Sequence, residues 1–238
     1  MITLKIDGKE VEVPEETTVL KAAEKAGVWI PTMCYNDLFE PYAVCRLCSV
    51  EVIKDKRSRI VTACNYPVAD GIEVLTDSEN IRWIRKLLME LMLSRWPNVK
   101  VVKEMAEKLN VEKSRFVSLE RDEAEDACIL CGQCVNVCRD VVKANVIGFS
   151  YRGIKREVVV PFDTHSDICI VCGACAHVCP TGHIKMVLED YKGKKPEFTL
   201  GPKTAIYVPT LQAVPRIPVI DTDSCIHFKT DGCETCAK

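Results

Sequence analysis

The sequence reads CILCGQCVNVC at residues 128–138 and CIVCGACAHVCP at residues 169–180. Both stretches space four cysteines as C-x2-C-x2-C-x3-C. This doubled spacing is typical of chains that bind two [4Fe–4S] clusters, in which the fourth cysteine of each run ligates the other cluster. Zinc or structural thiols are the alternative, but a zinc site needs only four ligands and does not require a doubled pattern. The spacing therefore assigns one cluster to Cys128, Cys131, Cys134 and Cys179, and the other to Cys138, Cys169, Cys172 and Cys175.

A second group of cysteines lies near the N-terminus. It consists of Cys34, Cys45, Cys48 and Cys64, spaced C-x10-C-x2-C-x15-C. Four thiolates with a central C-x2-C suit a [2Fe–2S] cluster, although the first gap is longer than in the plant-type spacing. A zinc site is the alternative for this group.

The residues around this group predict a small mixed domain. Residues 2–6 and 9–13 alternate apolar and polar side chains around Asp7-Gly8, which predicts a β-hairpin. Thr17 or Thr18 can cap a helix over residues 19–26. A hairpin followed by a helix is how a β-grasp ferredoxin begins. Further on, apolar residues recur at helical spacing between residues 79 and 110, interrupted by Pro97, and predict two helices with a buried face.

The N-terminal cysteine motifs carry a family resemblance. Residues 30–35 (IPTMCY) and 45–50 (CRLCSV) resemble the N-terminal domain of the large iron–sulfur subunit of complex I. Residues 1–190 as a whole resemble the electron-input region of that subunit, of NAD-linked formate dehydrogenases and of hydrogenases. The resemblance implies an electron-carrying role, but many enzymes share this arrangement of clusters.

One expected element of that family is missing. Its members usually hold a further [4Fe–4S] cluster with one histidine and three cysteines, and residues 91–98 and 105–109 resemble the segments on either side of it. Residues 65–127 contain neither histidine nor cysteine. We therefore expect no cluster there, with the flanking helices retained. His165, four residues before Cys169, is expected to be a surface residue.

The end of the chain differs in composition. Residues 192–196 (KGKKP) form a polar linker, and prolines interrupt the following segment, which predicts an extended tail that lies on a partner. Cys225, Cys233 and Cys236 are one thiolate short of a third [4Fe–4S] site. The fourth ligand could be a partner's cysteine, a non-cysteine group or a residue beyond Lys238. This tail resembles a segment of the flavoprotein component of heterodisulfide reductase.

These observations predict an α+β protein in four parts. Residues 1–78 form a [2Fe–2S] ferredoxin-like domain, 79–120 a helical connector, 121–190 a domain with two [4Fe–4S] clusters, and 191–238 the tail. The chain has 32 Lys and Arg against 34 Asp and Glu, which argues against a general nucleic-acid or membrane-surface binder. We expect no signal peptide, no membrane span and a reducing cytoplasmic location.

The sequence predicts an electron-transfer subunit without catalytic residues of its own. It would relay electrons between a flavin- or NAD(P)-linked partner and a second redox protein, in a heterodisulfide reductase, formate dehydrogenase or hydrogenase type of complex. The alternative is the N-terminal cluster region of a longer catalytic flavoprotein or formate-dehydrogenase-like enzyme. A redox or iron sensor is the third hypothesis, but the sequence shows no DNA-binding or signalling element to support it.

Overall fold

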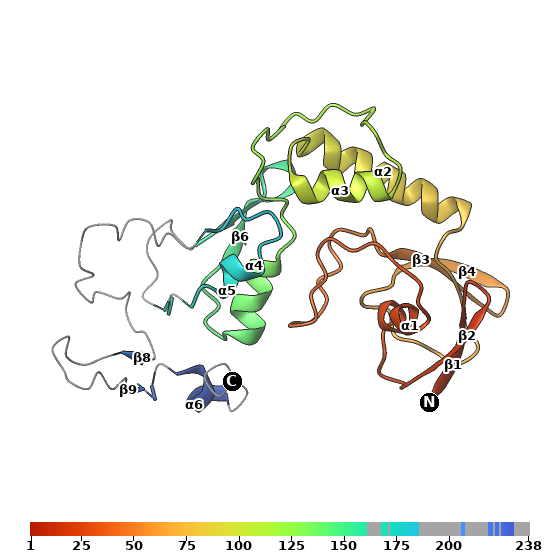
Figure 1. Cartoon of the computed structure of the whole chain (residues 1–238), viewed down its shortest axis with the longest axis horizontal. Coiled ribbons are helices and arrows are strands. Elements are labelled where there is room, and N and C mark those ends of the chain that lie inside the picture. The colour runs from red at the N-terminus through yellow and green to blue at the C-terminus, as the bar shows by residue number, and fades with distance from the viewer. Residues whose placement is uncertain are drawn as a thin grey trace. The chain divides into compact units, whose positions relative to one another are not determined.

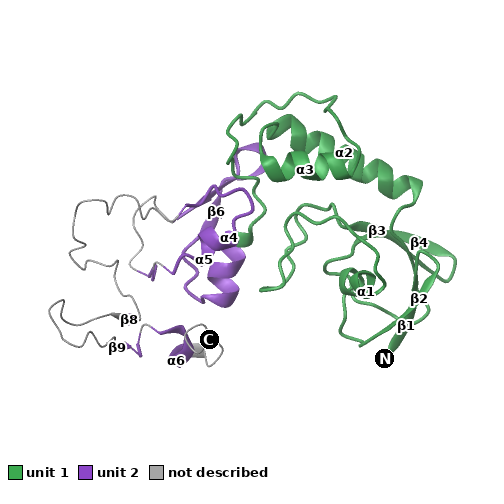
Figure 2. Ribbon diagram, viewed as in Figure 1, with its two compact units in different colours: residues 1–133 green, residues 134–238 purple. Residues whose placement is uncertain are grey.

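A computed structural model describes residues 1–160, 168–170, 172–185, 206–207, 219–220, 222–223 and 225–230. The chain divides into two compact units, residues 1–133 and residues 134–238 (Figure 2). The boundary falls inside the first of the two long cysteine runs, between Gln133 and Cys134. None of the helices in these described ranges is long and apolar enough to cross a bilayer.

Unit 1 is built on a five-stranded sheet with the order β2-β1-β5-β3-β4 (Figure 1). The strands are β1 (Ile2–Ile6), β2 (Lys9–Val13), β3 (Ser49–Lys54), β4 (Arg57–Thr62) and β5 (Glu73–Leu75). The β1–β5 pair is parallel and the other pairs are antiparallel. The predicted β1–β2 hairpin is confirmed. Its turn places Asp7 and Gly8 at φ 47° and 80°, the left-handed conformation that a two-residue hairpin turn needs.

Helix α1 (Val19–Lys25) packs on this sheet. Thr18 caps it, because the Lys21 N–H donates to Thr18 Oγ1 over 3.4 Å, as the sequence predicted. The α1 side chains that face the sheet are buried, and together with the inward face of the strands they form the first apolar core. The Cys48 and Cys64 side chains belong to this core.

Helices α2 (Glu79–Arg95) and α3 (Lys100–Lys108) follow the sheet and pack on each other. Ser78 caps α2, and Trp96 ends it. Ile81 of the predicted apolar stripe is buried, whereas Leu91 of that stripe is 46% exposed; Met89, outside the predicted stripe, is buried as well. A second apolar core forms between these helices and the N-terminal cysteine loop, and it contains both Cys34 and Cys45.

Unit 2 has much shorter elements. α4 (Gln133–Asn136) crosses the unit boundary and leads into η1 (Val137–Val141), a π-helix. The strands β6 (Gly148–Ser150) and β7 (Glu157–Val159) form a hairpin that encloses η2 (Gly153–Lys155), and α5 (Ala174–His177) packs on η1.

The predicted tail, residues 191–238, lies mostly outside the described residues. The helices and strands described in it are β8 (Ile206–Tyr207), β9 (Val219–Ile220) and α6 (Ile226–Thr230). The two short strands pair antiparallel. The prediction of an extended tail therefore stays a prediction.

Candidate iron–sulfur centres

The N-terminal cysteines come together in the interior of unit 1. Cys34, Cys45, Cys48 and Cys64 are 2%, 9%, 1% and 1% exposed. The Cys34 Sγ lies 3.4 Å from the Cys45 Sγ, and the thiols of Cys48 and Cys64 hydrogen-bond to each other. These buried sulfurs form two pairs of soft donors, which suit iron–sulfur clusters or zinc and no hard cation. Among the described residues no group of three or more Cys, His, Asp or Glu side chains is arranged closely enough to hold a single metal ion.

The electrostatics show that these thiols act on one another. The hydrogen bond with Cys34 lowers the pKa of Cys45 to about 6, and the same interaction raises the pKa of Cys34. The hydrogen bond between Cys48 and Cys64 likewise lowers the pKa of Cys48 and raises that of Cys64. Each pair therefore holds one thiolate readily, and bound metal would replace the remaining protons.

The loop around Cys45 is shaped to present backbone donors to sulfur. Arg46 has φ 61°, a left-handed conformation that turns the chain sharply between Cys45 and Cys48. The Cys45 N–H donates to the Cys34 Sγ over 3.5 Å. The Ser49 hydroxyl closes the same loop by donating to the Arg46 carbonyl over 2.6 Å.

Arg85 of α2 holds this loop from the other side. Its side chain is 6% exposed, its Nε donates to the Leu47 carbonyl over 3.1 Å, and its Nη2 donates to the Ser49 carbonyl over 2.9 Å. The two carbonyls flank Cys48, and burial lowers the pKa of the guanidinium. Sequence reasoning missed this residue. Its only signal is that Arg85 takes a core position, four residues from Ile81 and four from Met89.

Gln133 connects the two cysteine regions within unit 1. It is 6% exposed, its Nε2 donates to the Met33 carbonyl over 3.2 Å, and its Oε1 accepts from the Asn36 Nδ2 over 3.3 Å. Cys131 packs against the same apolar core as Cys34 and Cys45. The start of the first long cysteine run therefore lies beside the N-terminal site. Gln133 was also missed, because its partners are about one hundred residues away in sequence.

In unit 2 the structure brings Cys138 near the second run. The Cys138 side chain is 8% exposed, and its sulfur accepts a hydrogen bond from the Val146 N–H over 3.3 Å. Burial raises the pKa of Cys175, and negative charge on Cys172 and Cys138 adds to this rise. Cys138 and Cys172 are thus each within electrostatic reach of Cys175.

Most of the remaining described cysteines are less enclosed. Cys128, Cys131, Cys169, Cys175, Cys179 and Cys225 are half-buried, Cys134 is buried, and Cys172 is exposed. Burial opposes ionisation of Cys179, but N–H donors of Ile184 and His183 and the Thr181 hydroxyl bring its pKa below the usual value. His165, Cys233 and Cys236 lie outside the described residues, so the geometry of the predicted third site is not tested.

Asn136, between Cys134 and Cys138, supports a sulfur-rich ligand in this region. It is 1% exposed, and its Oδ1 accepts from the Arg139 Nη2 over 3.2 Å. Its Nδ2 is buried and has no hydrogen-bond partner among the described residues. A buried amide donor without an acceptor costs about 1–3 kcal/mol, so a cluster sulfur is a fitting acceptor. Arg139 itself pairs with the Asp140 carboxylate over 2.7 Å.

Comparison with protein families agrees with both sites. Residues 1–79 match the model of a 2Fe-2S iron-sulfur cluster binding domain, and residues 127–183 match that of a 4Fe-4S dicluster domain. The chain therefore contains one domain of each of these two iron–sulfur families. The first match contains all four N-terminal cysteines, and the second contains both long cysteine runs. An iron–sulfur role is thereby favoured over a zinc site at either place.

Three curated relatives extend this comparison. The iron–sulfur protein is 33% identical over 230 residues to the alpha chain of the NADPH-Fe(3+) oxidoreductase of Geobacter sulfurreducens. It is 31% identical to the HndD component of the NADP-reducing hydrogenase of Solidesulfovibrio fructosivorans, and 30% identical to the G component of the NADH-quinone oxidoreductase of Rickettsia bellii. The matches cover 88%, 68% and 66% of this chain but only 27%, 32% and 26% of the relatives.

A solved structure shows the same fold. It is the crystal structure of an NAD+-reducing [NiFe]-hydrogenase in the H2-reduced state, with a TM-score of 0.59 and 24% sequence identity. The similarity covers 67% of the iron–sulfur protein and 75% of the hydrogenase chain.

Proposed function

We propose that this chain relays single electrons through one [2Fe–2S] and two [4Fe–4S] clusters. The observation that carries the proposal is the burial of four mutually interacting thiols in unit 1, inside a segment that matches a 2Fe-2S domain. The clusters supply the one-electron chemistry, and the protein sets their burial, hydrogen bonding and spacing. The ligands follow the sequence prediction: Cys34, Cys45, Cys48 and Cys64; Cys128, Cys131, Cys134 and Cys179; Cys138, Cys169, Cys172 and Cys175.

The surrounding residues have distinct tasks in this proposal. Arg85 fixes the loop that carries Cys48 and places a buried positive charge beside the first cluster. Positive charge favours the reduced, more negative cluster and so raises its potential. Asn136 donates its free Nδ2 hydrogen to a cluster sulfur, and Gln133 holds the Cys131 segment against the N-terminal site.

The partners in this proposal are other redox proteins. A flavin- or NAD(P)-linked protein would deliver or receive electrons at one end of the chain, and a second redox protein would do so at the other end. The names of the relatives, which are components of NADPH-, NADP- and NADH-linked enzymes, support this assignment. We place the chain in the cytoplasm, because ligation by free thiolates needs a reducing compartment.

The helical connector and the tail belong to the same proposal. Residues 79–120 would bridge the two cluster-binding domains without holding a cluster, because they contain no cysteine or histidine. Cys225, Cys233 and Cys236 would hold a third [4Fe–4S] cluster together with a fourth ligand from elsewhere. Only Cys225 lies among the described residues, at the start of α6.

One observation favours a second candidate function. The chain spans only 26% to 32% of the length of the relatives that it matches. In this second candidate function, the chain is the N-terminal cluster region of a longer catalytic oxidoreductase. In that enzyme the same clusters would carry electrons to a flavin or metal centre in the same polypeptide.

An anaerobic redox titration followed by EPR tests the relay. The wild-type chain should show one [2Fe–2S] and two [4Fe–4S] signals, each taking up one electron reversibly. Cys48→Ser should lose only the [2Fe–2S] signal, and Cys175→Ser should lose one [4Fe–4S] signal. A Cys48→Ser variant that keeps the [2Fe–2S] spectrum would contradict the ligand assignment. Native mass spectrometry of the complex would identify the partner.

A further inference from the structure

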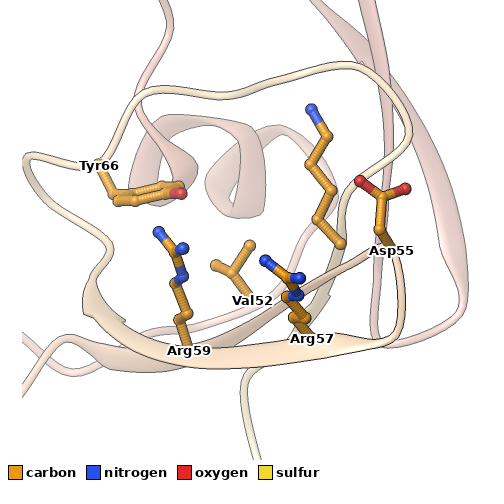
Figure 3. Close-up of a pocket in the computed structure, with 6 residues that line it drawn as sticks. Val52, Asp55, Arg57, Arg59 and Tyr66 are labelled. Carbon is orange, nitrogen blue, oxygen red and sulfur yellow. The ribbon is translucent and has the colours of Figure 1, made fainter.

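A hollow of about 410 Å³ lies on the β3–β4 hairpin, and half of its six lining residues are basic. Its lining includes Lys54, Arg57 and Arg59 against one acidic residue, Asp55. Val52 lies between the two guanidinium groups, and the Tyr66 ring stands opposite Arg59 (Figure 3). A hollow of this size is in the range of ligand-binding clefts.

The strand register explains why the basic groups converge. Arg57 pairs with Lys54, and Arg59 pairs with Val52. Alternate residues of a strand share one face, so both arginines and Lys54 project from the same side of the sheet. Glu51 alternates with these positions and so lies on the opposite face, where the hydroxyls of Ser58 and Ser78 donate to it.

The three cations form no ion pair among the residues that the structure describes. Lys54 and Arg57 stand directly opposite each other, and like charges in that position destabilise a strand pair. The whole chain carries a formal charge of −2, so this local excess of positive charge is not a property of the protein surface in general. The hairpin thus keeps an unfavourable charge pair that an external anion would relieve.

β4 also has a free edge in the described sheet. It is the last strand in the order β2-β1-β5-β3-β4, so β3 is its only described neighbour. An extended segment of another protein can pair with such an edge through its backbone. Its alternate side chains would then fall on the face that carries Arg57 and Arg59, which are two residues, or about 7 Å, apart along the strand.

We propose that the β4 edge and its basic hollow dock an extended acidic segment of a partner protein, with carboxylates at alternate positions opposite Arg57 and Arg59. Tyr66 and Val52 supply the apolar floor beside these charges. A protein segment is favoured over a nucleotide, because phosphate sites are usually built from helix N-termini or successive backbone N–H groups. Here side chains on a strand and a hairpin line the hollow.

Fluorescence anisotropy tests the proposal with the anaerobically purified, cluster-loaded full chain. The probe is a labelled eight-residue peptide that alternates Glu and Thr. We expect it to bind, and the same peptide with Lys in place of Glu not to bind. The double variant Arg57→Gln with Arg59→Gln should bind about tenfold more weakly, the effect of losing two exposed ion pairs. The control Lys103→Gln with Lys108→Gln, two exposed cations of α3, should bind within twofold of wild type.

Three results would overturn this docking site. The first is that the Glu–Thr peptide does not bind to wild type. The second is that the α3 control loses as much affinity as the Arg57/Arg59 double variant. The third is that a peptide with all its Glu residues in one block binds as tightly as the alternating peptide. Displacement of the probe by inorganic phosphate at a concentration below that of free peptide would show a small-anion site instead. Lys54→Gln serves as a second variant, and iron content checks that each variant is loaded. Loss of iron in wild type would contradict the proposed relay and not the docking site.

Discussion

The two cysteine regions are built in opposite ways. In unit 1 the four N-terminal cysteines are at most 9% exposed, and they sit between a five-stranded sheet and two helices with continuous apolar cores. In unit 2 the second run is half-buried or exposed, and its helix α5 has only four residues. The first site is therefore organised by protein packing. Among the described residues the second has no comparable apolar core, so we expect bound metal to hold its loops together.

Removal of iron should give the largest difference in behaviour between the two cysteine regions. After anaerobic treatment with ferricyanide and EDTA, we expect hydrogen exchange in residues 134–160 and 172–185 to become fast, because metal binding contributes on the order of 10 kcal/mol to small metal-stapled folds. Amides of β1 to β5 should stay protected. Mass-spectrometric hydrogen exchange measures both in one experiment. Equal loss of protection in the sheet would show that unit 1 also depends on its cluster.

Replacing Arg85 tests how far packing, and not metal, holds the N-terminal site. Arg85→Met leaves the buried carbonyls of Leu47 and Ser49 without a donor, at a cost of about 1–3 kcal/mol for each group. It should also lower the [2Fe–2S] potential by about 60 mV, a tenfold change for a one-electron couple. Denaturant unfolding and an EPR-monitored titration measure the two effects.

Arg82→Met is the matched control for this change. Arg82 lies on the same helix, its side chain is 63% exposed, and its ion pair with Asp77 is on the surface. We expect a change of at most about 0.5 kcal/mol and no change in potential. Arg85→Lys should recover part of both losses. Equal effects of the two Met variants would show that Arg85 has no special relation to the cluster loop.

Replacement of Asn136 tests how a single hydrogen-bond donor in unit 2 affects the potential of a cluster there. Asn136→Leu removes a buried Nδ2 donor without a partner among the described residues, and one hydrogen bond from Arg139, which keeps its ion pair with Asp140. The expected loss of stability is therefore small, about 1 kcal/mol. The substitution should shift one [4Fe–4S] potential to lower values by about 30–60 mV, because hydrogen bonds to sulfur stabilise the reduced cluster. The [2Fe–2S] signal is the internal control. An unchanged pair of [4Fe–4S] potentials would assign the free Nδ2 to some other acceptor.

The smallest effect is expected at Asp37, on the surface beside the N-terminal site. The Lys21 Nζ lies 2.6 Å from Asp37 Oδ1, and this contact lowers the pKa of the carboxyl below its ordinary value near 4. A carboxylate with a lowered pKa contributes stability above that value and loses it as the pH falls through the folded-state pKa. Asp37→Asn should therefore cost about 0.5 kcal/mol or less, equally at pH 7 and pH 5. Thermal unfolding at the two pH values checks this, and a cost that fades by pH 5 would contradict it.

Local sequence signals account for the parts of the fold that were predicted. The Asp7-Gly8 turn, the Thr18 cap and the helix near residues 101–109 all depend on neighbouring residues, and all are present. Arg85 and Gln133 could not be predicted, because each acts on backbone groups 36 or more residues away in sequence. The edge position of β4 could not be predicted either, because the alternation of basic residues in a strand does not indicate which strands pair with it. The cysteine sites could be predicted although their ligands are far apart in sequence, because iron–sulfur clusters require characteristic spacings of their ligands.

The central claim is that twelve of the fifteen cysteines hold iron as one [2Fe–2S] and two [4Fe–4S] clusters. Mössbauer spectroscopy of the ⁵⁷Fe-enriched, anaerobically purified chain, combined with iron and zinc quantification, tests it most directly. We predict about ten irons per chain, of which about two belong to the [2Fe–2S] cluster and about eight to the two [4Fe–4S] clusters. The total would be about fourteen if the tail holds a third [4Fe–4S] cluster. A colourless chain that contains only zinc would contradict the claim.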